Sequence, residues 1–309
     1  MPNHAETRSA KPPRFPPWLR KRVPTGEAAA RVRSLLAELG LATVCSSARC
    51  PNLPECFARG TATFLILGRS CTRSCRFCAI SNEPPGPLRD EEPEAVADAC
   101  ERLGLRHVVI TSVTRDDLPD GGAEHFARTI RAVRRRMPNT VIEVLTPDFL
   151  GRQASVDIVL DAEPHVFNHN VETVPRLYPE VRPQADYRRS LGVLAHARRR
   201  AGHGAASLYT KSGLMVGLGE TADEVRTVLG DLRGAGCDIV TLGQYLAPSS
   251  AHVPVARFVE PAEFEAWEAE ARGLGFAAVA AGPFVRSSYQ AESLFEGRRD
   301  AGRQGQRRI

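Results

Sequence analysis

The sequence predicts an α/β fold, a partial (β/α) TIM-type barrel of about six strand–helix units with N- and C-terminal extensions. Apolar runs of strand length alternate with segments of helical period over residues 61–281, which is typical of a parallel sheet. The number of these units suits a barrel, and a doubly wound open sheet is the alternative. The 309 residues, 42% hydrophobic and 25% charged, have the composition of a globular protein that can bury such a core.

An N-terminal extension over residues 1–60 precedes the predicted barrel. A helix is expected at residues 27–40, where apolar residues recur at helical spacing and a glycine marks the end. Residues 43–60 contain two prolines and no sustained period, so this stretch is predicted to be a loop. The first barrel strand follows at residues 61–68, a compact apolar run of strand type.

The remaining barrel elements follow in a regular order. Apolar residues three and four apart indicate the helices, and short apolar runs between turn residues indicate the strands. Two helix starts carry further signals, a capping box from Thr221 to Glu224 and a first-turn proline at Pro261. The predicted helices are 96–104, 126–133, 187–194, 221–232 and 261–271, and the predicted strands are 107–111, 140–145, 157–160, 165–168, 207–216, 239–244 and 276–280.

A C-terminal segment, residues 282–309, lies outside the predicted barrel. Its basic tail from Glu296 has little to bury and is predicted to be disordered.

The chain has 41 Lys and Arg against 36 Asp and Glu, and a net charge of +5 is too small to indicate nucleic-acid binding. The first residues contain no apolar run of signal-peptide or membrane-span length, so a cytoplasmic protein with no membrane partner is expected.

Six of the eight cysteines form two triplets, and the triplets predict metal sites. They are Cys45, Cys50 and Cys56, and then Cys71, Cys75 and Cys78. In a reducing compartment clustered cysteines are more often metal ligands than disulfides. Three thiolates on the short loop after the first strand can hold three irons of a 4Fe-4S cluster and leave the fourth iron open. Zinc is the alternative, but structural zinc takes four protein ligands and no further cysteine pair follows Cys78.

The two other cysteines are predicted to be small core residues. Cys100 lies on the apolar face of a predicted helix, and Cys237 directly precedes a predicted strand. Either of them would complete the first triplet only if the fold brought it close to Cys45.

The second triplet, with Phe77 before its last cysteine, resembles the motif of the radical S-adenosylmethionine (radical SAM) superfamily. The resemblance implies that S-adenosylmethionine chelates the open iron and is split by an electron from the cluster, which gives a 5′-deoxyadenosyl radical. It also implies contacts to this cofactor at two strand ends, from Asn170 and Glu172 and from Gly217 and Glu220. Ordinary surface polarity at the first strand end and a simple turn at the second are the alternatives.

The two triplets in this order resemble those of the lipoyl synthase family. Residues 114–122, 169–174 and 285–289 extend the resemblance over most of the chain. It implies two 4Fe-4S clusters, of which the auxiliary one is held by the first triplet and by a serine, here Ser288 with Ser287 as the adjacent competitor. An alkoxide matches iron less well than a thiolate does, so the serine bond is the weakest. The auxiliary cluster is implied to supply both sulfur atoms of the product.

The reaction that this resemblance implies is a sulfurtransferase reaction, sulfur insertion at C6 and C8 of a protein-bound octanoyl chain. Acid–base side chains cannot activate such carbon–hydrogen bonds, whereas a cofactor-derived radical can. The implied partners are octanoylated lipoyl domains of 2-oxoacid dehydrogenases, the glycine cleavage H protein and an electron donor. Arginines within 131–136 and 198–200 are candidates for steering an acidic carrier, with solvated helix faces as the alternative. The rival functions are a radical SAM methylthiotransferase and a non-catalytic metal-binding protein.

Overall fold

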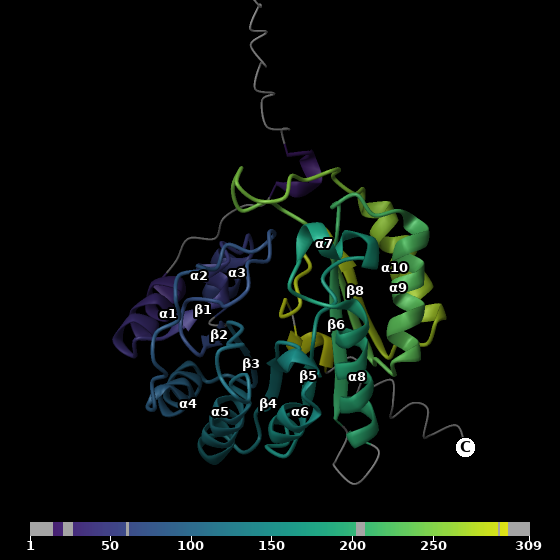
Figure 1. The fold of residues 1–309 in the computed structure, drawn as a ribbon. Helices are drawn as coiled ribbons and strands as arrows, with labels where there is room; N and C mark the ends of the chain where they lie inside the picture. The colour runs from purple at the N-terminus through teal and green to yellow at the C-terminus, as the bar shows by residue number, and fades with distance from the viewer. Residues whose placement is uncertain (1–14, 21–26, 60–61, 202–207, 290, 296–309) are drawn as a thin grey trace, which may run out of the picture.

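The computed structural model describes residues 15–20, 27–59, 62–201, 208–289 and 291–295. Within these ranges an eight-stranded sheet follows the chain order from β1 to β8 (Figure 1). The first strand is antiparallel to the second, and each later neighbouring pair is parallel. The strands are β1 (Ala42–Thr43), β2 (Thr63–Ile66), β3 (His107–Ser112), β4 (Val141–Leu145), β5 (Val166–Asn168), β6 (Tyr209–Val216), β7 (Ile239–Gln244) and β8 (Ala278–Gly282).

The parallel strands confirm the predicted partial barrel. From β2 to β8 the described chain makes six strand–helix–strand crossovers. The strand order has none of the reversal that defines a doubly wound sheet. Among the described residues β8 pairs with neither β1 nor β2, so the sheet stays open along one seam. The boundaries predicted at residues 60 and 281 remain predictions, and the tail from Glu296 lies outside the described residues.

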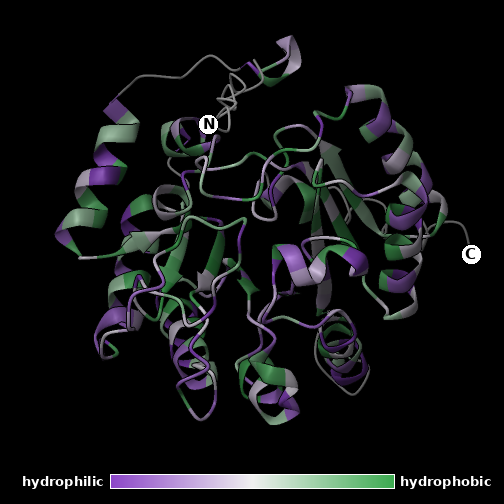
Figure 2. Cartoon of the chain, turned by 45° about the horizontal axis from the view of Figure 1, so that its top comes forward, coloured by the Kyte–Doolittle hydropathy of each residue, from purple (hydrophilic) through white to green (hydrophobic). Residues whose placement is uncertain are grey.

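The crossover helices cover the outer face of the sheet, and their green, hydrophobic sides turn towards the strands (Figure 2). None of the described helices is long and apolar enough to cross a bilayer. The helices are α1 (Glu27–Glu38), α2 (Val44–Ser47), α3 (Leu53–Ala58), α4 (Glu92–Leu103), α5 (Ala123–Arg136), α6 (Gln153–Leu160), α7 (Tyr178–Val181), α8 (Tyr187–Ala201), α9 (Ala222–Gly234) and α10 (Pro261–Gly273). Short 3-10 turns are η1 (Pro17–Leu19), η2 (Phe149–Gly151) and η3 (Pro175–Leu177).

Residues 157–160 are helical, so the strand predicted there is wrong. They form the end of α6, in which Val156 and Val159 are both buried. These branched residues suit a strand locally, and β propensity depends strongly on such context. Because β4 and β5 are parallel, however, the chain between them must run back from the end of β4 to the start of β5, and a helix is the usual form of such a crossover. The tertiary requirement for a crossover therefore overrides the local preference.

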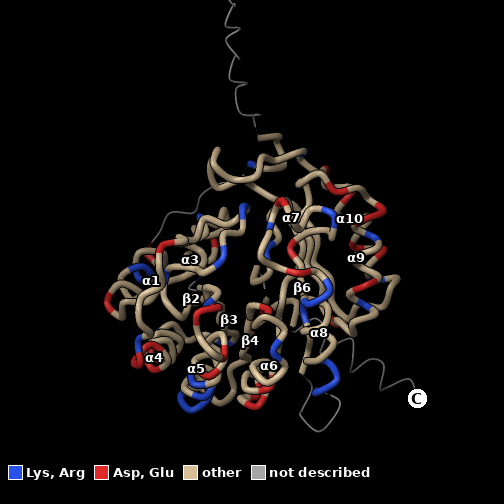
Figure 3. The backbone as a smooth tube through the Cα atoms, viewed as in Figure 1, with Lys and Arg blue, Asp and Glu red and all other residues tan. Residues whose placement is uncertain are grey.

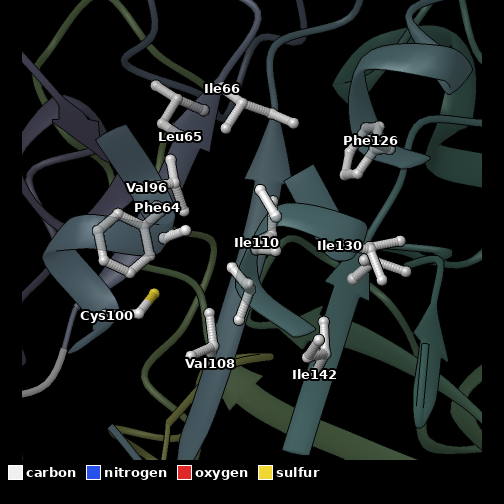
Figure 4. Packing of buried hydrophobic residues seen from close by; sticks show 14 of the residues in the cluster. Phe64, Leu65, Ile66, Val96, Cys100, Val108, Ile110, Phe126, Ile130 and Ile142 are labelled. Carbon is white, nitrogen blue, oxygen red and sulfur yellow. The ribbon is translucent and has the colours of Figure 1, made fainter. Parts of the chain in front are cut away.

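The packing under α4 and α5 shows how the barrel wall is stabilised (Figure 4). Phe64 of β2 lies beside Cys100 of α4, and Ile142 of β4 lies beside Ile130 of α5. All four side chains are completely buried, and burial of each large apolar side chain contributes about 1.5–3 kcal/mol. The prediction that Cys100 is a small core residue is confirmed.

The two arginine groups lie at the carboxyl ends of α5 and α8. Crossover helices run against the strands, so these ends lie at the opposite side of the barrel from the strands' carboxyl ends. Basic and acidic residues alternate on the outer helices (Figure 3). Arg136 pairs with Asp98 of α4, and Arg200 pairs with Asp157 and Asp161 of α6. Charged helix faces therefore account for these groups, and exposed pairs of this kind contribute at most about 1 kcal/mol each.

A buried ion pair links the middle strands. Lys211 Nζ on β6 lies 2.8 Å from Glu143 Oε1 on β4, and each side chain is only 1% exposed. Burial by itself raises the pKa of the Glu143 carboxyl, but the charge of Lys211 and the contact with His107 outweigh burial and lower it to about 2. Glu143 is therefore ionised throughout the neutral range, and its stabilising effect depends on that charge.

Replacing Glu143 with glutamine should reduce the free energy of unfolding by about 3 kcal/mol, because Lys211 would keep a buried charge without a counter-charge. In the parent protein the carboxyl binds protons more readily when unfolded, at a pKa near 4.5, than when folded, at about 2. The stabilisation that ionised Glu143 gives to the folded state should thus be fully present above pH 4.5. It should be lost as the pH falls to about 2. Urea unfolding followed by circular dichroism at several pH values measures both effects. An identical acid slope in Glu143→Gln and parent would contradict this account.

Candidate active site

One cavity of about 530 Å³ opens at the carboxyl ends of the strands, where (β/α) barrels place their sites. Strand ends from β3 to β7 contribute to its wall, together with the loop after β2 and the chain after β8. The predicted site residues that line it are Cys45, Cys50, Cys71, Cys75, Cys78, Asn170, Glu172, Ser287 and Ser288. The fold therefore brings together residues from both cysteine triplets and from the C-terminal segment.

The second triplet lies on the loop after β2, as predicted. The backbone N–H groups of Arg73 and Thr114 donate to Cys71 Sγ over 3.4 and 3.3 Å. Burial raises the pKa of the Cys75 thiol and raises that of Cys78 to about 12. Binding of a cluster must therefore displace protons from these thiols, because the thiolate is the metal ligand.

No three His, Cys, Asp or Glu side chains in the described parts of the chain converge closely enough to hold one metal ion. A 4Fe-4S cube differs from a single ion because each cysteine binds a separate iron at its own corner. Three thiols spread around one cavity wall are consistent with that arrangement.

A buried charge network fixes this loop to the barrel. Arg73, between the first two cysteines of the triplet, lies 2.6 Å from both Asp116 and Asp148. Arg189 of α8 also donates to Asp148, over 2.8 Å. Burial acts to raise the pKa of Asp148, but Arg73 outweighs it and holds this pKa far below the usual range. The network joins the cluster loop to the β3–α5 and β4–α6 connections and to α8.

Cys45 and Cys56 of the first triplet lie on two short helices with Cys50 between them, so the loop predicted at residues 43–60 is only partly correct. Thr43 caps α2 by accepting a hydrogen bond from the Ser46 N–H, and this places Cys45 in the first turn. The Cys50 N–H donates to Cys45 O over 3.0 Å, which brings these two residues together. Cys56 lies on α3 and does not line the cavity. Helices of one turn are short enough to escape a search for helical period.

The C-terminal segment packs against this first triplet. Asn52 donates to Phe284 O over 2.7 Å, and Tyr289 OH donates to Glu55 over 3.0 Å. Thr63 Oγ1 of β2 donates to Ser288 Oγ over 2.9 Å, and Thr63 also hydrogen-bonds to Cys45. Ser288 is therefore separated from Cys45 by the single side chain of Thr63.

Ser287 faces a different part of the cavity. Its Oγ accepts a hydrogen bond of 2.6 Å from Asn170 Nδ2, at the end of β5. The same Asn170 amide group donates to Glu172 over 3.1 Å. Burial raises the pKa of Glu172, although nearby Arg182 lowers it in part. The two adjacent serines thus point to different sides of the site.

Several buried polar atoms on the cavity wall have no hydrogen-bond partner within the described chain. They are Ser112 Oγ, Thr146 Oγ1, His169 Nε2 and Asn170 Oδ1. Burial lowers the pKa of His169 to about 4, so its ring is neutral at pH 7. Its Nδ1 lies 2.9 Å from Thr146 O and must donate there, which leaves Nε2 as an acceptor facing the cavity. Unsatisfied buried groups of this kind indicate a wall built for a polar ligand.

Gly217 and Glu220 form a turn after β6 and do not line the cavity. The Glu220 carboxylate accepts from the Gly217 and Leu218 N–H groups over 2.6 and 2.9 Å. Gly217 has φ +95°, and a Cβ atom there would lie 2.2 Å from Gln244 Nε2. The turn thus has a structural reason for these residues, and a contact with the cofactor stays a prediction.

The remaining cysteines do not belong to the site. Cys237 is completely buried, and burial raises the pKa of its thiol to about 12. Neither Cys237 nor Cys100 lines the cavity. The prediction that they are core residues is confirmed.

Sequence reasoning missed Thr63 and the two aspartates that hold Arg73, and it included His169 only as part of the strand-end segment 169–174. Asp116 falls within the segment 114–122 that carried the resemblance, so a signal was present there. Thr63 and Asp148 belong to parts of the chain that showed only strand and loop patterns. Their role follows from contacts between distant segments.

Comparisons with known proteins agree with this geometry. A family model described as the Radical SAM superfamily matches residues 65–232, and one described as the N-terminal domain of lipoyl synthase matches residues 3–50. The chain is 55% identical to the lipoyl synthase of Chlorobium limicola, over 92% of this chain and 96% of that one. It is 56% identical to that of Methylococcus capsulatus, over 91% and 86%. The solved structure of methylornithine synthase (PylB) shares the fold, with TM-score 0.51 at 13% identity, over 89% and 92%.

Proposed function

This chain belongs to the lipoyl synthase family of the radical SAM superfamily, and we propose that the cavity described above is where it inserts sulfur into its substrate. The protein is an enzyme of the sulfurtransferase class that uses S-adenosylmethionine and a 4Fe-4S cluster. The observation that carries the proposal is that Ser288 and five of the six triplet cysteines, all but Cys56, meet at one cavity.

Cys71, Cys75 and Cys78 are the proposed ligands of the radical SAM cluster. They fit because three half-buried thiols share one loop, and Arg73 fixes that loop to the barrel. With S-adenosylmethionine bound, the cluster supplies the electron that generates the 5′-deoxyadenosyl radical. Two backbone N–H groups donate to Cys71 Sγ, and hydrogen bonds to ligand sulfurs adjust the reduction potential of a cluster.

S-adenosylmethionine is proposed to bind along the strand ends of β3 to β6. It carries an amine, a carboxylate and two ribose hydroxyls, and the unsatisfied atoms of Ser112, Thr146 and His169 provide matching partners. Asn170 and Glu172 lie at the same edge, and Glu172 is a half-buried carboxyl group able to accept from hydroxyl groups. Gly217 and Glu220 are proposed to shape the adjacent turn on which the adenine rests.

Cys45, Cys50, Cys56 and Ser288 are the proposed ligands of an auxiliary cluster. The contact through Thr63 supports Ser288, because it places that hydroxyl group next to Cys45, whereas Ser287 is hydrogen-bonded to Asn170. An alkoxide is a poorer match for iron than a thiolate, so this corner opens most readily. A cluster that is consumed as the sulfur donor requires such a corner.

The proposed substrate is an octanoyl chain on a lysine of a lipoyl carrier protein, a lipoyl domain of a 2-oxoacid dehydrogenase or the glycine cleavage H protein. Two S-adenosylmethionine molecules would supply the radicals that take one hydrogen atom each from C6 and C8. The auxiliary cluster would supply the two sulfide ions, and its ferric irons would accept the electron released as each carbon–sulfur bond forms. Apolar residues such as Val44, Leu65 and Val113 line the cavity and suit a saturated chain. A separate electron donor is also required.

The test is anaerobic incubation of the reconstituted enzyme with an octanoylated carrier peptide, S-adenosylmethionine and reductant. Mass spectrometry should detect a product that has gained two sulfur atoms, and about eight irons per chain should be bound. About four irons, or cleavage of S-adenosylmethionine without any thiolated product, would count against the two-cluster proposal.

Substitutions of the two serines should separate their roles. Ser288→Ala should lower the iron content and the yield of thiolated product, whereas Ser287→Ala should keep the iron and weaken S-adenosylmethionine binding. Ser288→Cys should keep the iron but slow sulfur transfer, since a thiolate holds the corner more firmly. Iron analysis measures the iron content of each variant, and electron paramagnetic resonance measures the state of its clusters. A Ser287→Ala protein that loses half its iron, beside an intact Ser288→Ala protein, would reverse the assignment.

A further inference from the structure

The chain after β8 crosses the interior of the barrel from its mouth to its floor. It leaves β8 at Gly282, on the side where the strands end. Glu292 then lies 2.6 Å from Arg106, the residue directly before β3. Because the strands are parallel, the residues before β3 mark the opposite end of the barrel.

Two glycines leave room for this crossing. A Cβ atom on Gly243 of β7 would lie 2.1 Å from Val285 O, and one on Gly213 of β6 would lie 3.2 Å from Ser287 Oγ. Backbone and side chains of the segment thus occupy space that side chains of β6 and β7 would otherwise fill. Its position on the mouth side is fixed by these close contacts.

Phe295 fixes the other end of the segment. It is 8% exposed, and its ring packs edge-on against His107, His165 and Tyr209 at centroid distances of 5.9, 6.5 and 5.7 Å. These partners stand at or just before the starts of β3, β5 and β6. The ring therefore closes the floor of the barrel, on the side away from the cavity.

Ser288 lies between these two fixed points, on a stretch that forms no strand pairing in the described chain. Its hydroxyl group accepts a hydrogen bond from Thr63, and its neighbours Ser287 and Tyr289 are bonded to Asn170 and Glu55. Because the stretch has no strand pairing, its position depends on these side-chain contacts and on the residues that follow it, and segments with few buried contacts open easily. The floor contact of Phe295 is the nearest large apolar anchor on its C-terminal side.

We propose that Phe295 is a positioning residue that acts through the barrel floor to hold Ser288 beside the first cysteine triplet. The inference rests on the proposed function for the identity of Ser288 as a cluster ligand. The position of the segment follows from its contacts and is independent of that function. Loss of the ring should therefore loosen residues 284–289 and uncover Cys45 in the metal-free protein.

The test compares Phe295→Ala with Phe276→Ala, a control phenylalanine that is equally buried but packs against Arg233. In the metal-free protein, maleimide labelling of Cys45 should be roughly five-fold faster in Phe295→Ala, as expected for local opening, with Cys71 unchanged. Phe276→Ala should leave both rates at parent values. The conservative substitution Phe295→Tyr should keep the labelling of Cys45 as slow as in the parent. If circular dichroism shows that Phe295→Ala does not fold, Phe295→Leu is measured in its place.

A second measurement reports on the cluster itself. In a protein lacking the second triplet, Phe295→Ala should alter the electron paramagnetic resonance signal of the auxiliary cluster in the same way as Ser288→Ala. Unchanged Cys45 labelling and an unchanged signal would overturn the inference, even if the parent enzyme makes thiolated product. If the parent makes no such product, the proposed function fails, and the labelling ratio still decides whether Phe295 positions the segment.

Discussion

Cys71→Ala should abolish cleavage of S-adenosylmethionine, whereas Cys45→Ala should keep cleavage and abolish sulfur transfer. Cys71 is held on a loop that the Arg73 network fixes, and its loss removes a proposed ligand of the cluster that supplies the radical. Cys45 is 5% exposed beside Thr63, and its loss affects the proposed sulfur donor alone. The lost step should fall by more than roughly 100-fold, since loss of even an outer-shell partner of a metal site has effects of that size.

Chromatography of 5′-deoxyadenosine measures cleavage, and mass spectrometry of the carrier peptide measures sulfur transfer. Cys237→Ala is the matched control, because this cysteine is buried and lies outside the cavity. It should lower stability without separating the two activities. Thiolated product from the Cys45→Ala protein would refute the assignment of the first triplet as the sulfur-donor site.

Asp148→Asn should destabilise the protein by about 3 kcal/mol and impair assembly of the radical SAM cluster. The substitution leaves Arg73 with only Asp116 as counter-charge and removes the carboxylate that Arg189 contacts. Breaking a buried pair on one side is strongly destabilising because the remaining charge stays desolvated. Denaturant unfolding measures the first effect, and iron content after reconstitution measures the second.

Asp223→Asn is the control for this substitution. Asp223 pairs with Arg226 on the surface of α9 and is 91% exposed, so its loss should change stability by at most about 0.5 kcal/mol. Normal stability with normal iron binding in Asp148→Asn would show that the network does not hold the cluster loop.

Much of the barrel follows from local signals in the sequence. The capping box at Thr221 and Glu224 and the first-turn Pro261 both mark observed helix starts, because capping depends on residues within one turn. The helix at 153–160 was not predicted, since its valines also suit a strand and only the crossover requirement decides between them. The one-turn helices α2 and α3 are too short to show a period.

In the candidate site, too, local motifs could be predicted from the sequence, whereas contacts between distant segments could not. The second triplet could be recognised because its ligands lie within eight residues on one loop. The residues that support it, such as Asp148 for Arg73 and Thr63 for Ser288, come from distant segments and leave no local pattern. The same holds for Phe295, whose partners are three separate strand starts.

The contacts of the C-terminal segment also determine the order in which the two sites mature. Asn52, Glu55 and Thr63 bond to residues 225 to 234 positions later in the chain. During translation the first triplet therefore leaves the ribosome long before its cover exists, although domains fold from the N-terminus as they emerge. The loop of the second triplet has contacts as far along the chain as residues 252 and 253, where His252 Nε2 lies 3.1 Å from Cys78 O and the Val253 N–H donates to Arg76 O. The proposed radical SAM site can thus form before residues 284–289, which cover the proposed auxiliary site, have been synthesised.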